Sequence, residues 1–373
     1  MLCRGAGPLP EWIADNLSLK QAVASWQAEI ALDTEFIRTD TYYPLPGLYQ
    51  VASQEDFFLI DPLAIDDWQP FAEYLERGDR VKVMHACLED LELIYHHLNV
   101  RPKGIFDTQF AHAFVSADYS LSYTGLVKSR LNQVLDQHET RSNWLRRPLS
   151  QTQLDYAVED VTYLVPMYRQ LSRALDHSER LGWFQEDMAR RGDYQSADPH
   201  ECYRTIKKAS LLRGQSLAVL KSLAAWREKT ARRENIPRNR VIWEEHLLEF
   251  AKTEVLDVSQ IQQVLPRGVA RRYGEDLLLQ HELGRRAAEP PDLPRPLSSA
   301  QSALLKKLKV SARFHAQRLQ LAPELLSRKK ELEACIRYFS EHNKLPPLYD
   351  GWRSEILGSD FLDILRGGNG SHG

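Results

Sequence analysis

The sequence has 373 residues, enough for two or three domains that each bury a core. Hydrophobic residues make up 43% and charged residues 27% of the chain, which excludes disordered and fibrous proteins. No apolar run is long enough to cross a membrane, and the N-terminal stretch lacks the pattern of a signal peptide. Four cysteines stand far apart without CxxC spacing, which argues against a zinc site or disulfides. We therefore expect a cytoplasmic protein.

Charge is unevenly distributed along the chain. Residues 1–200 carry a formal charge of −12 and residues 201–373 carry +9, which together give the total of −3. An acidic half joined to a basic half indicates an acidic, metal-loaded site beside a surface for a polyanion. The alternative is that the asymmetry only reflects solvation, because charge patterning alone does not define a function.

The first third of the chain is rich in short β-type runs with turn signals between them. We predict strands at 29–37, 48–53, 57–62 and 81–86. Apolar residues then recur at helical spacing, which predicts helices at 88–98, 107–115 and 150–175. Ser150 is the expected N-cap of the last helix, with Gln153 at the capping-box position. Strands followed by mixed helices predict an α/β domain that ends near residue 195.

The second half of the chain has a helical pattern and almost no strand signal. Amphipathic helices are predicted across 205–285 and again across 298–365, and the proline-rich linker "EPPDLPRP" at 289–296 separates the two sets. Both sets share a rhythm of helix, proline turn and helix, which indicates a weak internal duplication. The predicted domains are 1–195, 205–288 and 296–366.

Acidic side chains occur at three points of the predicted α/β domain. Asp33 and Glu35 lie two residues apart on a strand, so their side chains point to the same side of the sheet. Asp90 lies at the start of a helix, and Asp160 follows Tyr156 by four residues, which puts that carboxylate and phenol on one helix face. Four carboxylates in one cleft need cations, and oxygen ligands favour Mg²⁺ or Mn²⁺ over zinc.

Such a site suits phosphodiester hydrolysis by two metal ions roughly 3.5–4 Å apart. One ion activates the attacking water and the other stabilises the leaving 3′ oxygen. We expect Tyr156 to position the water, because a phenol with a pKa near 10 is a poor base at neutral pH. Each motif alone has an ordinary alternative: a solvated strand edge, a helix cap or a pair on a helix surface. Their joint occurrence in this order favours the metal site.

Three motifs, "LDTEF", "HACLEDL" and "YAVEDVTYL", stand in this order. They resemble the DEDD exonuclease superfamily in its tyrosine-containing subgroup, and within it the bacterial ribonuclease D family. The stretches "TYYPLPGLYQVA" and "RSNWLRRPLSQTQLDYAVEDV" match that family as well. The segment "AAWREKTARRENIPRNRVI" at 224–242 resembles the HRDC domain, a helical nucleic-acid-binding module, and the residues after the proline-rich linker resemble a second, diverged copy.

The resemblance implies a ribonuclease H-like α/β exonuclease domain with a mixed sheet, followed by two small all-α HRDC-type domains. It implies a 3′→5′ exoribonuclease that releases nucleoside 5′-monophosphates and trims structured RNA, especially tRNA precursors. The implied catalytic residues are Asp33, Glu35, Asp90, Tyr156 and Asp160, and the four carboxylates among them are the implied ligands of two Mg²⁺ or Mn²⁺ ions. We expect a monomer that does not bind membranes. A DNA exonuclease on the same fold and a non-catalytic RNA-binding protein are the alternatives.

Basic and aromatic side chains outside this set are candidates for RNA contact. The candidates are Trp144, Arg146, Arg147, Arg227, Arg232, Arg238 and Arg240. The first three precede the third motif and suit base stacking and phosphate contact, although a loop anchored by the tryptophan is an equal alternative. The other four lie in the first helical module and suit salt-sensitive phosphate binding, with a solvated helix face as the alternative.

Overall fold

The computed structural model describes residues 9–135 and 142–369. The chain forms two compact units, and each unit combines separate stretches of sequence. The first unit contains the chain up to Ile37, Pro46–Tyr194 and the chain from Leu297 onward. The second contains Arg38–Leu45 and Gln195–Pro296, so a short loop near the N-terminus belongs with a helical region much later in the sequence. Within the described residues, no helix combines the length and apolar character needed to cross a membrane.

A mixed six-stranded sheet forms the centre of the first unit. Its strands are β1 (Glu11–Ile13), β2 (Glu29–Ile37), β3 (Leu45–Ser53), β4 (Asp56–Ile60), β5 (Val81–Met84) and β6 (Ile105–Asp107). The spatial order is β1-β4-β3-β2-β5-β6; β1 is parallel to β4, β5 is parallel to both β2 and β6, and β3 is antiparallel to β4. The predicted mixed sheet is confirmed. Because β2 has a hydrogen-bonded neighbour on each side, it is a firm support for functional side chains.

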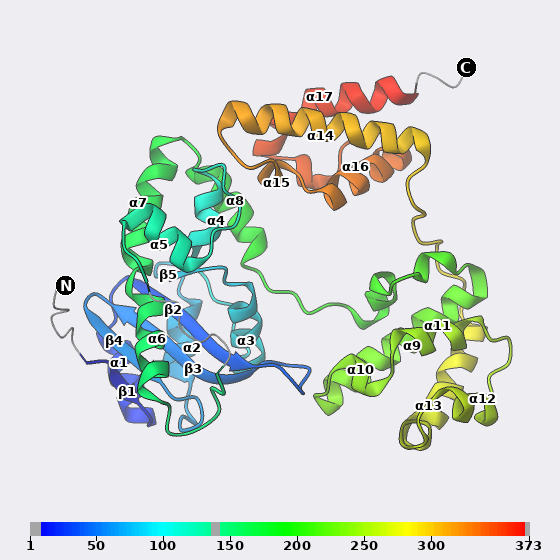
Figure 1. Ribbon diagram of the computed structural model, residues 1–373, viewed down its shortest axis with the longest axis horizontal. Coiled ribbons are helices and arrows are strands. Elements are labelled where there is room, and N and C mark those ends of the chain that lie inside the picture. Colours follow the sequence, from blue (N-terminus) through cyan, green and yellow to red (C-terminus); the bar gives the residue numbers. More distant parts are fainter. Residues whose placement is uncertain (1–8, 136–141, 370–373) are drawn as a thin grey trace. The chain divides into compact units, whose positions relative to one another are not determined.

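Helices accompany this sheet along the chain. They are α1 (Asn16–Ser25), α2 (Gln69–Glu76), α3 (Leu88–Leu98), α4 (Thr108–Ala113), α5 (Tyr123–Leu131), α6 (Gln151–Thr162), α7 (Leu164–His177) and α8 (Leu181–Arg191). Helix α6 crosses the sheet and packs against β2 and β4 (Figure 1). The predicted capping box is confirmed, since Ser150 and Gln153 exchange side chain-to-backbone hydrogen bonds.

The single helix predicted at 150–175 is wrong, because the structure has two helices there. Tyr163 lies between α6 and α7 with φ −103° and ψ 0°. Pro166 follows in the first turn of α7, and proline has no N–H to donate to the carbonyl four residues earlier. The ladder of hydrogen bonds therefore cannot run through this point, and α7 leaves α6 to pack against β2 and β5.

The C-terminal helices belong to the first unit. They are α14 (Ser299–Leu319), α15 (Pro323–Leu326), α16 (Lys329–His342) and α17 (Trp352–Asn369), with a short 3₁₀ turn η3 (Pro347–Tyr349). A buried ion pair joins α17 to α8, because Arg353 donates to both carboxylate oxygens of Asp187 at 2.7 and 2.6 Å. Next to this pair, the rings of Trp352 and Trp183 stack with centroids 4.9 Å apart.

The second unit is almost entirely helical. It contains the 3₁₀ turns η1 (Pro199–Thr205) and η2 (Ala209–Leu211) and the helices α9 (Gly214–Glu234), α10 (Arg238–Val241), α11 (Glu244–Lys252), α12 (Val258–Val264) and α13 (Arg267–Arg286). Helix α9 packs against α11, α13 and η1. The buried cluster of this unit includes Leu220, Leu223, Phe250 and Leu277 from these elements.

The loop between β2 and β3 packs against these helices through Tyr42. Tyr42 is 8% exposed and donates its hydroxyl hydrogen to Glu228 of α9. The backbone N–H groups of Tyr42 and Tyr43 both donate to the Asn235 side chain, at 3.1 and 3.0 Å. The loop 38–45 thus contributes an aromatic side chain to the core of a unit that is otherwise formed by residues 195–296.

Candidate active site

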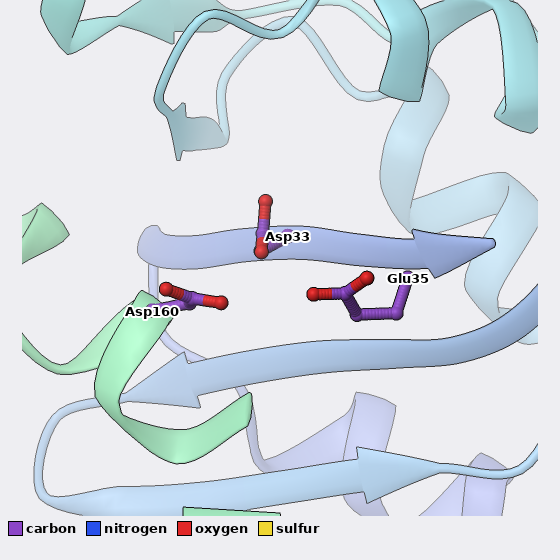
Figure 2. Close-up of side chains that lie close together, drawn as sticks. All are labelled: Asp33, Glu35 and Asp160. Carbon is purple, nitrogen blue, oxygen red and sulfur yellow. The ribbon is translucent and has the colours of Figure 1, made fainter. Parts of the chain in front are cut away.

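The first two carboxylates of the site come from the middle of β2. Side chains alternate along a strand, and Leu32 and Thr34 are buried while Asp33 and Glu35 are half-buried. Asp160 comes from α6, which packs against this strand. Asp33, Glu35 and Asp160 each offer one carboxylate oxygen, and these oxygens all lie within 4.8 Å of one another (Figure 2). The structure therefore brings together three of the four carboxylates that were predicted to be metal ligands.

Asp90 lies beside this group and is held by the same strand. It is in the first turn of α3, is 8% exposed, and accepts a hydrogen bond from the Thr34 hydroxyl group. Its charge still reaches the group, because it contributes to the raised pKa of Asp33. The hydrogen bond between Thr34 and Asp90 could not be predicted from the sequence. The alternation of side chains along a strand predicts only that Thr34 points away from Asp33 and Glu35.

Burial raises the pKa values of all four carboxyl groups, and neighbouring negative charges raise them further. Burial, followed by the charges of Asp160 and Asp90, raises the pKa of Glu35 to about 8. Burial raises the pKa of Asp160 to about 7, and it raises the pKa of Asp90 to about 6 against the lowering effect of the Thr34 hydrogen bond. Burial is also the main cause that raises the pKa of Asp33. Buried carboxyl groups whose pKa values are raised in this way bind either protons or cations.

Tyr156 lies one helical turn before Asp160 and forms a hydrogen bond with its carboxylate. Burial and the charges of Asp160 and Glu35 raise the pKa of the phenol, so Tyr156 remains protonated at neutral pH. It can donate a hydrogen bond in the cleft but cannot act as a base there.

The loop before α6 packs against Tyr156 through Trp144. Trp144 is 2% exposed and its ring lies 6.2 Å from the Tyr156 ring, within a buried cluster that includes Leu48 and Leu59. The chain passes so close to it that a Cβ atom added at Gly47 would lie 2.5 Å from the Trp144 Cβ, so only glycine fits. The geometry of Trp144 thus matches the alternative of a loop anchor, not that of a stacking surface for bases.

The two arginines of this loop have different surroundings. Arg147 donates to both oxygens of Asp61, at 2.7 and 2.5 Å, and also to the carbonyl groups of Gly47 and Trp144. These bonds use its guanidinium group to fix the loop on the sheet. Arg146 is exposed, and its exposure is compatible with the predicted phosphate contact.

Asp107 fixes the turn that leads into α3. This carboxylate is completely buried and accepts hydrogen bonds from the backbone N–H groups of Ala86 and Phe110 at 3.0 and 3.1 Å and of Cys87 at 3.3 Å. Ala86 has a φ of 55°, a backbone conformation that costs free energy for a residue other than glycine. Asp107 therefore stabilises the turn that sets the position of Asp90 on α3.

The candidate arginines of the second unit are mostly committed to its fold. Arg227 is 4% exposed, with its guanidinium 3.7 Å from Glu244. Arg232 and Arg238 both bind the carboxylate of Glu228, at 2.8 and 2.5 Å. Arg240 is exposed and pairs with Asp40 at 3.1 Å. All four candidates thus have carboxylate partners inside this unit. Arg232 and Arg238 also donate to the Tyr42 hydroxyl group.

The three described cysteines form neither a disulfide nor a part of the carboxylate group. Cys87, Cys202 and Cys335 are free thiols. Cys3 lies outside the described residues.

A mixed sheet with an Asp-x-Glu pair on an inner strand, and a Tyr–Asp pair on the helix that crosses it, defines a 3′–5′ exonuclease domain of the DEDD type. The family model described as 3′-5′ exonuclease matches residues 10–176, and the HRDC domain model matches residues 216–279. Ribonuclease D of Pseudomonas paraeruginosa is 41% identical, over 96% of this chain and 98% of its own length. The chain belongs to the ribonuclease D family, and it is a 3′–5′ exoribonuclease.

Other relatives and solved structures agree with this assignment. Ribonuclease D of Escherichia coli K12 is 32% identical, over 94% of this chain and 96% of its own length. The crystal structure of E. coli RNase D, described as an exoribonuclease involved in structured RNA processing, matches with a TM-score of 0.85 at 31% identity and covers 96% of this chain and 99% of that chain. The catalytic core of RRP6 from Trypanosoma brucei shares the fold, with a TM-score of 0.59 at 22% identity over 76% of this chain and 81% of that one.

Proposed function

We propose that this chain removes nucleotides from the 3′ end of RNA by hydrolysis with two Mg²⁺ or Mn²⁺ ions and releases nucleoside 5′-monophosphates. The proposed metal ligands are Asp33, Glu35, Asp90 and Asp160, and Tyr156 completes the catalytic set. The observation that carries this proposal is the close approach of the Asp33, Glu35 and Asp160 carboxylates beside the Tyr156 phenol.

The donor set fits hard divalent cations. In the described part of the chain, the group that could hold a metal ion consists of carboxylates alone, the ligands that Mg²⁺ and Mn²⁺ prefer. When bound, two such ions supply an activated water and stabilise the charge on the leaving 3′ oxygen. The raised pKa values of Glu35 and Asp160 mean that a cation replaces protons that these groups otherwise hold.

The other residues of the site orient the reacting groups. Tyr156 keeps its proton, so its phenol positions the attacking water through a hydrogen bond and does not act as a base. The bond between Tyr156 and Asp160 fixes the direction of the phenol. The Thr34 hydroxyl holds the Asp90 carboxylate, and Asp107 holds the turn before it.

We infer that the natural substrates are structured RNAs such as tRNA precursors with 3′ extensions, and that the protein acts as a cytoplasmic monomer. The relative of solved structure is described as acting in structured RNA processing, and residues 201–373 of this chain carry a net charge of +9, which favours binding to a polyanion. We further infer that an exonuclease domain at 1–195 and an HRDC domain at 205–288 are followed by a second, diverged HRDC-like domain at 296–366.

A digestion experiment tests the proposed function. The purified chain is incubated with a 5′-labelled RNA of tRNA-like sequence and Mg²⁺ or Mn²⁺, with EDTA as the metal-free control. We expect the labelled RNA to shorten stepwise, mononucleotides to appear, and EDTA to stop the reaction. Asp33→Asn is expected to reduce the rate by at least about 100-fold, because it removes a charged ligand from the metal site.

Two outcomes of this experiment count against the proposal. Wild-type protein that leaves the RNA intact at every metal concentration would show that the carboxylate cluster does not perform the reaction. An Asp33→Asn variant as active as the wild type would show that hydrolysis occurs elsewhere. A matched DNA oligonucleotide tests the alternative of a DNA exonuclease. Equal rates of digestion for the RNA and the DNA would show that the protein does not prefer RNA.

A further inference from the structure

A groove runs along one face of α9 in the second unit. It has a volume of about 460 Å³ and lies between α9, the C-terminal end of α13 and His200 of η1. Its apolar lining consists of Ala218, Ala225, Trp226, Leu283, Ala287 and Ala288. Leu283 is 48% exposed, so apolar surface is accessible in this groove. An apolar surface of this kind is suited to the face of a nucleic-acid base.

Three cations line the same groove. Lys221, Lys229 and Arg233 are spaced by eight and four residues, which places them on one face of α9. At about 1.5 Å of rise per residue, the row extends over about 18 Å. Lys229 and Arg233 are exposed and Lys221 is half-buried. Among the described residues that line the groove there is no aspartate or glutamate, so its lining is positively charged.

The contacts of these cations leave most of their charge available. Lys229 Nζ lies 3.0 Å from His200 Nε2, and Lys221 Nζ lies 5.7 Å from the centre of the Tyr203 ring. Arg233 donates to Glu234 at 3.3 Å. Glu234 also accepts hydrogen bonds from Arg272 and Tyr273, so it neutralises only a part of the charge of Arg233.

We propose that this groove, and not the arginine cluster around Glu228, is the surface with which the HRDC domain binds single-stranded RNA. Phosphate groups contact the row of three cations, and bases lie against the exposed apolar lining at Leu283, Ala287 and Ala288. A stacked strand carries one phosphate per about 3.4 Å, so the row spans about five phosphates. The inference rests on the proposed function for the identity of the polyanion as RNA.

Binding of the full chain to RNA tests this surface. Fluorescence anisotropy is measured with a labelled oligo(A) of about 20 nucleotides, in EDTA so that the RNA stays intact, from about 50 to about 200 mM salt. The variant combines Lys221→Ala, Lys229→Ala and Arg233→Ala. We expect its Kd to rise at least about tenfold, and the slope of log K against log salt to fall in magnitude by about 2, because each lost phosphate contact removes about 0.7.

A control variant carries the same change in net charge on other faces of the same unit. It combines Lys252→Ala, Arg267→Ala and Arg271→Ala, which are all exposed and do not line the groove. We expect it to keep the wild-type salt slope. The single variant Lys229→Ala, expected to lower the slope by about 0.7, replaces the triple variant if thermal denaturation shows that the latter has lost its fold.

The outcomes separate the two proposals. A groove variant whose affinity and salt slope equal those of the control variant would overturn the groove as the binding surface, while RNA digestion by the wild type would still support the proposed function. Wild-type protein that binds oligo(A) through the groove but does not digest RNA with Mn²⁺ would overturn the proposed function and leave the groove assigned.

Discussion

Thr34 connects two parts of the active site at the scale of single residues. It lies between Asp33 and Glu35 on β2, yet its hydroxyl group binds Asp90 on α3. This hydrogen bond lowers the pKa of Asp90, against the burial that raises it. Thr34 therefore keeps Asp90 in the ionised form and in the position that a metal ligand needs.

Replacement of Thr34 by the isosteric valine is expected to weaken metal binding. Thr34→Val removes the donor and leaves the buried Asp90 carboxylate without it, so we expect the Kd for Mn²⁺ to rise about tenfold. Isothermal titration calorimetry measures this change without relying on catalysis. Thr34→Ser retains a hydroxyl group and should bind Mn²⁺ within about threefold of the wild type. Equal affinities of the wild type and Thr34→Val would show that Thr34 has no part in positioning the ligand.

The raised pKa values of Glu35 and Asp160 predict a pH dependence. In the unfolded chain these groups titrate near 4.5 and 3.8, and in the metal-free fold near 8 and 7. Between these values the folded state binds more protons, so the stability of the metal-free protein falls as the pH rises from about 4 to about 8. Metal binding requires the ionised groups and strengthens over the same range.

Thermal denaturation in EDTA and in Mn²⁺ measures this dependence. The midpoint in EDTA should fall with rising pH, and the increase caused by Mn²⁺ should grow. Glu35→Gln lacks one of the two groups, so its midpoint in EDTA should fall less than that of the wild type, and other titrating groups cancel in this comparison. The same fall in both proteins would contradict the assignment of the raised pKa to Glu35.

At the scale of elements, the sequence predicted features that a local period determines, but it did not predict how the loops pack. Strand β2 has the predicted bounds 29–37, and the Tyr156–Asp160 pair shares a helix face as predicted, because the periods of strands and helices determine both. The strands β1 and β6, at three residues each, are too short to leave a pattern. The burial of Trp144 depends on where the loop before α6 meets β3, which no local period encodes.

The arginines of α9 and α10 show the same distinction. Their spacing and charge favoured phosphate binding, but Arg232 and Arg238 bind Glu228 and Tyr42. Tyr42 lies nearly 190 residues earlier in the chain, and the hydrogen bond from its hydroxyl group to Glu228 spans 186 residues of sequence. A contact between residues this far apart in the sequence depends on the folded unit, so it cannot be predicted from a single sequence.

At the scale of the whole molecule, the Asp187–Arg353 pair joins the C-terminal helices to α8. Both side chains are nearly inaccessible, at 5% and 7% exposure, and the pair has two parallel hydrogen bonds. Arg353→Met leaves the Asp187 charge buried with fewer partners, so we expect a loss of about 3–5 kcal/mol in the free energy of unfolding. Urea denaturation of the full chain measures this loss in the free energy of unfolding.

A second arginine provides the control for this prediction. Arg190 also binds Asp187, but its side chain is 45% exposed. Arg190→Met is therefore expected to cost less than about 1 kcal/mol. Similar losses for the two variants would show that the burial of Arg353 is not what makes the pair important.

The loop 38–45 also determines how the protein can be divided. A truncation after residue 195 looks natural in the sequence, but it would remove the partners of Tyr42 and expose an aromatic side chain directly after the strand that carries Asp33 and Glu35. An exchange of HRDC domains between relatives meets the same difficulty. The exchangeable piece is not one continuous segment but two, and a chimaera keeps a complete helical core only if the loop and residues 195–296 come from the same parent.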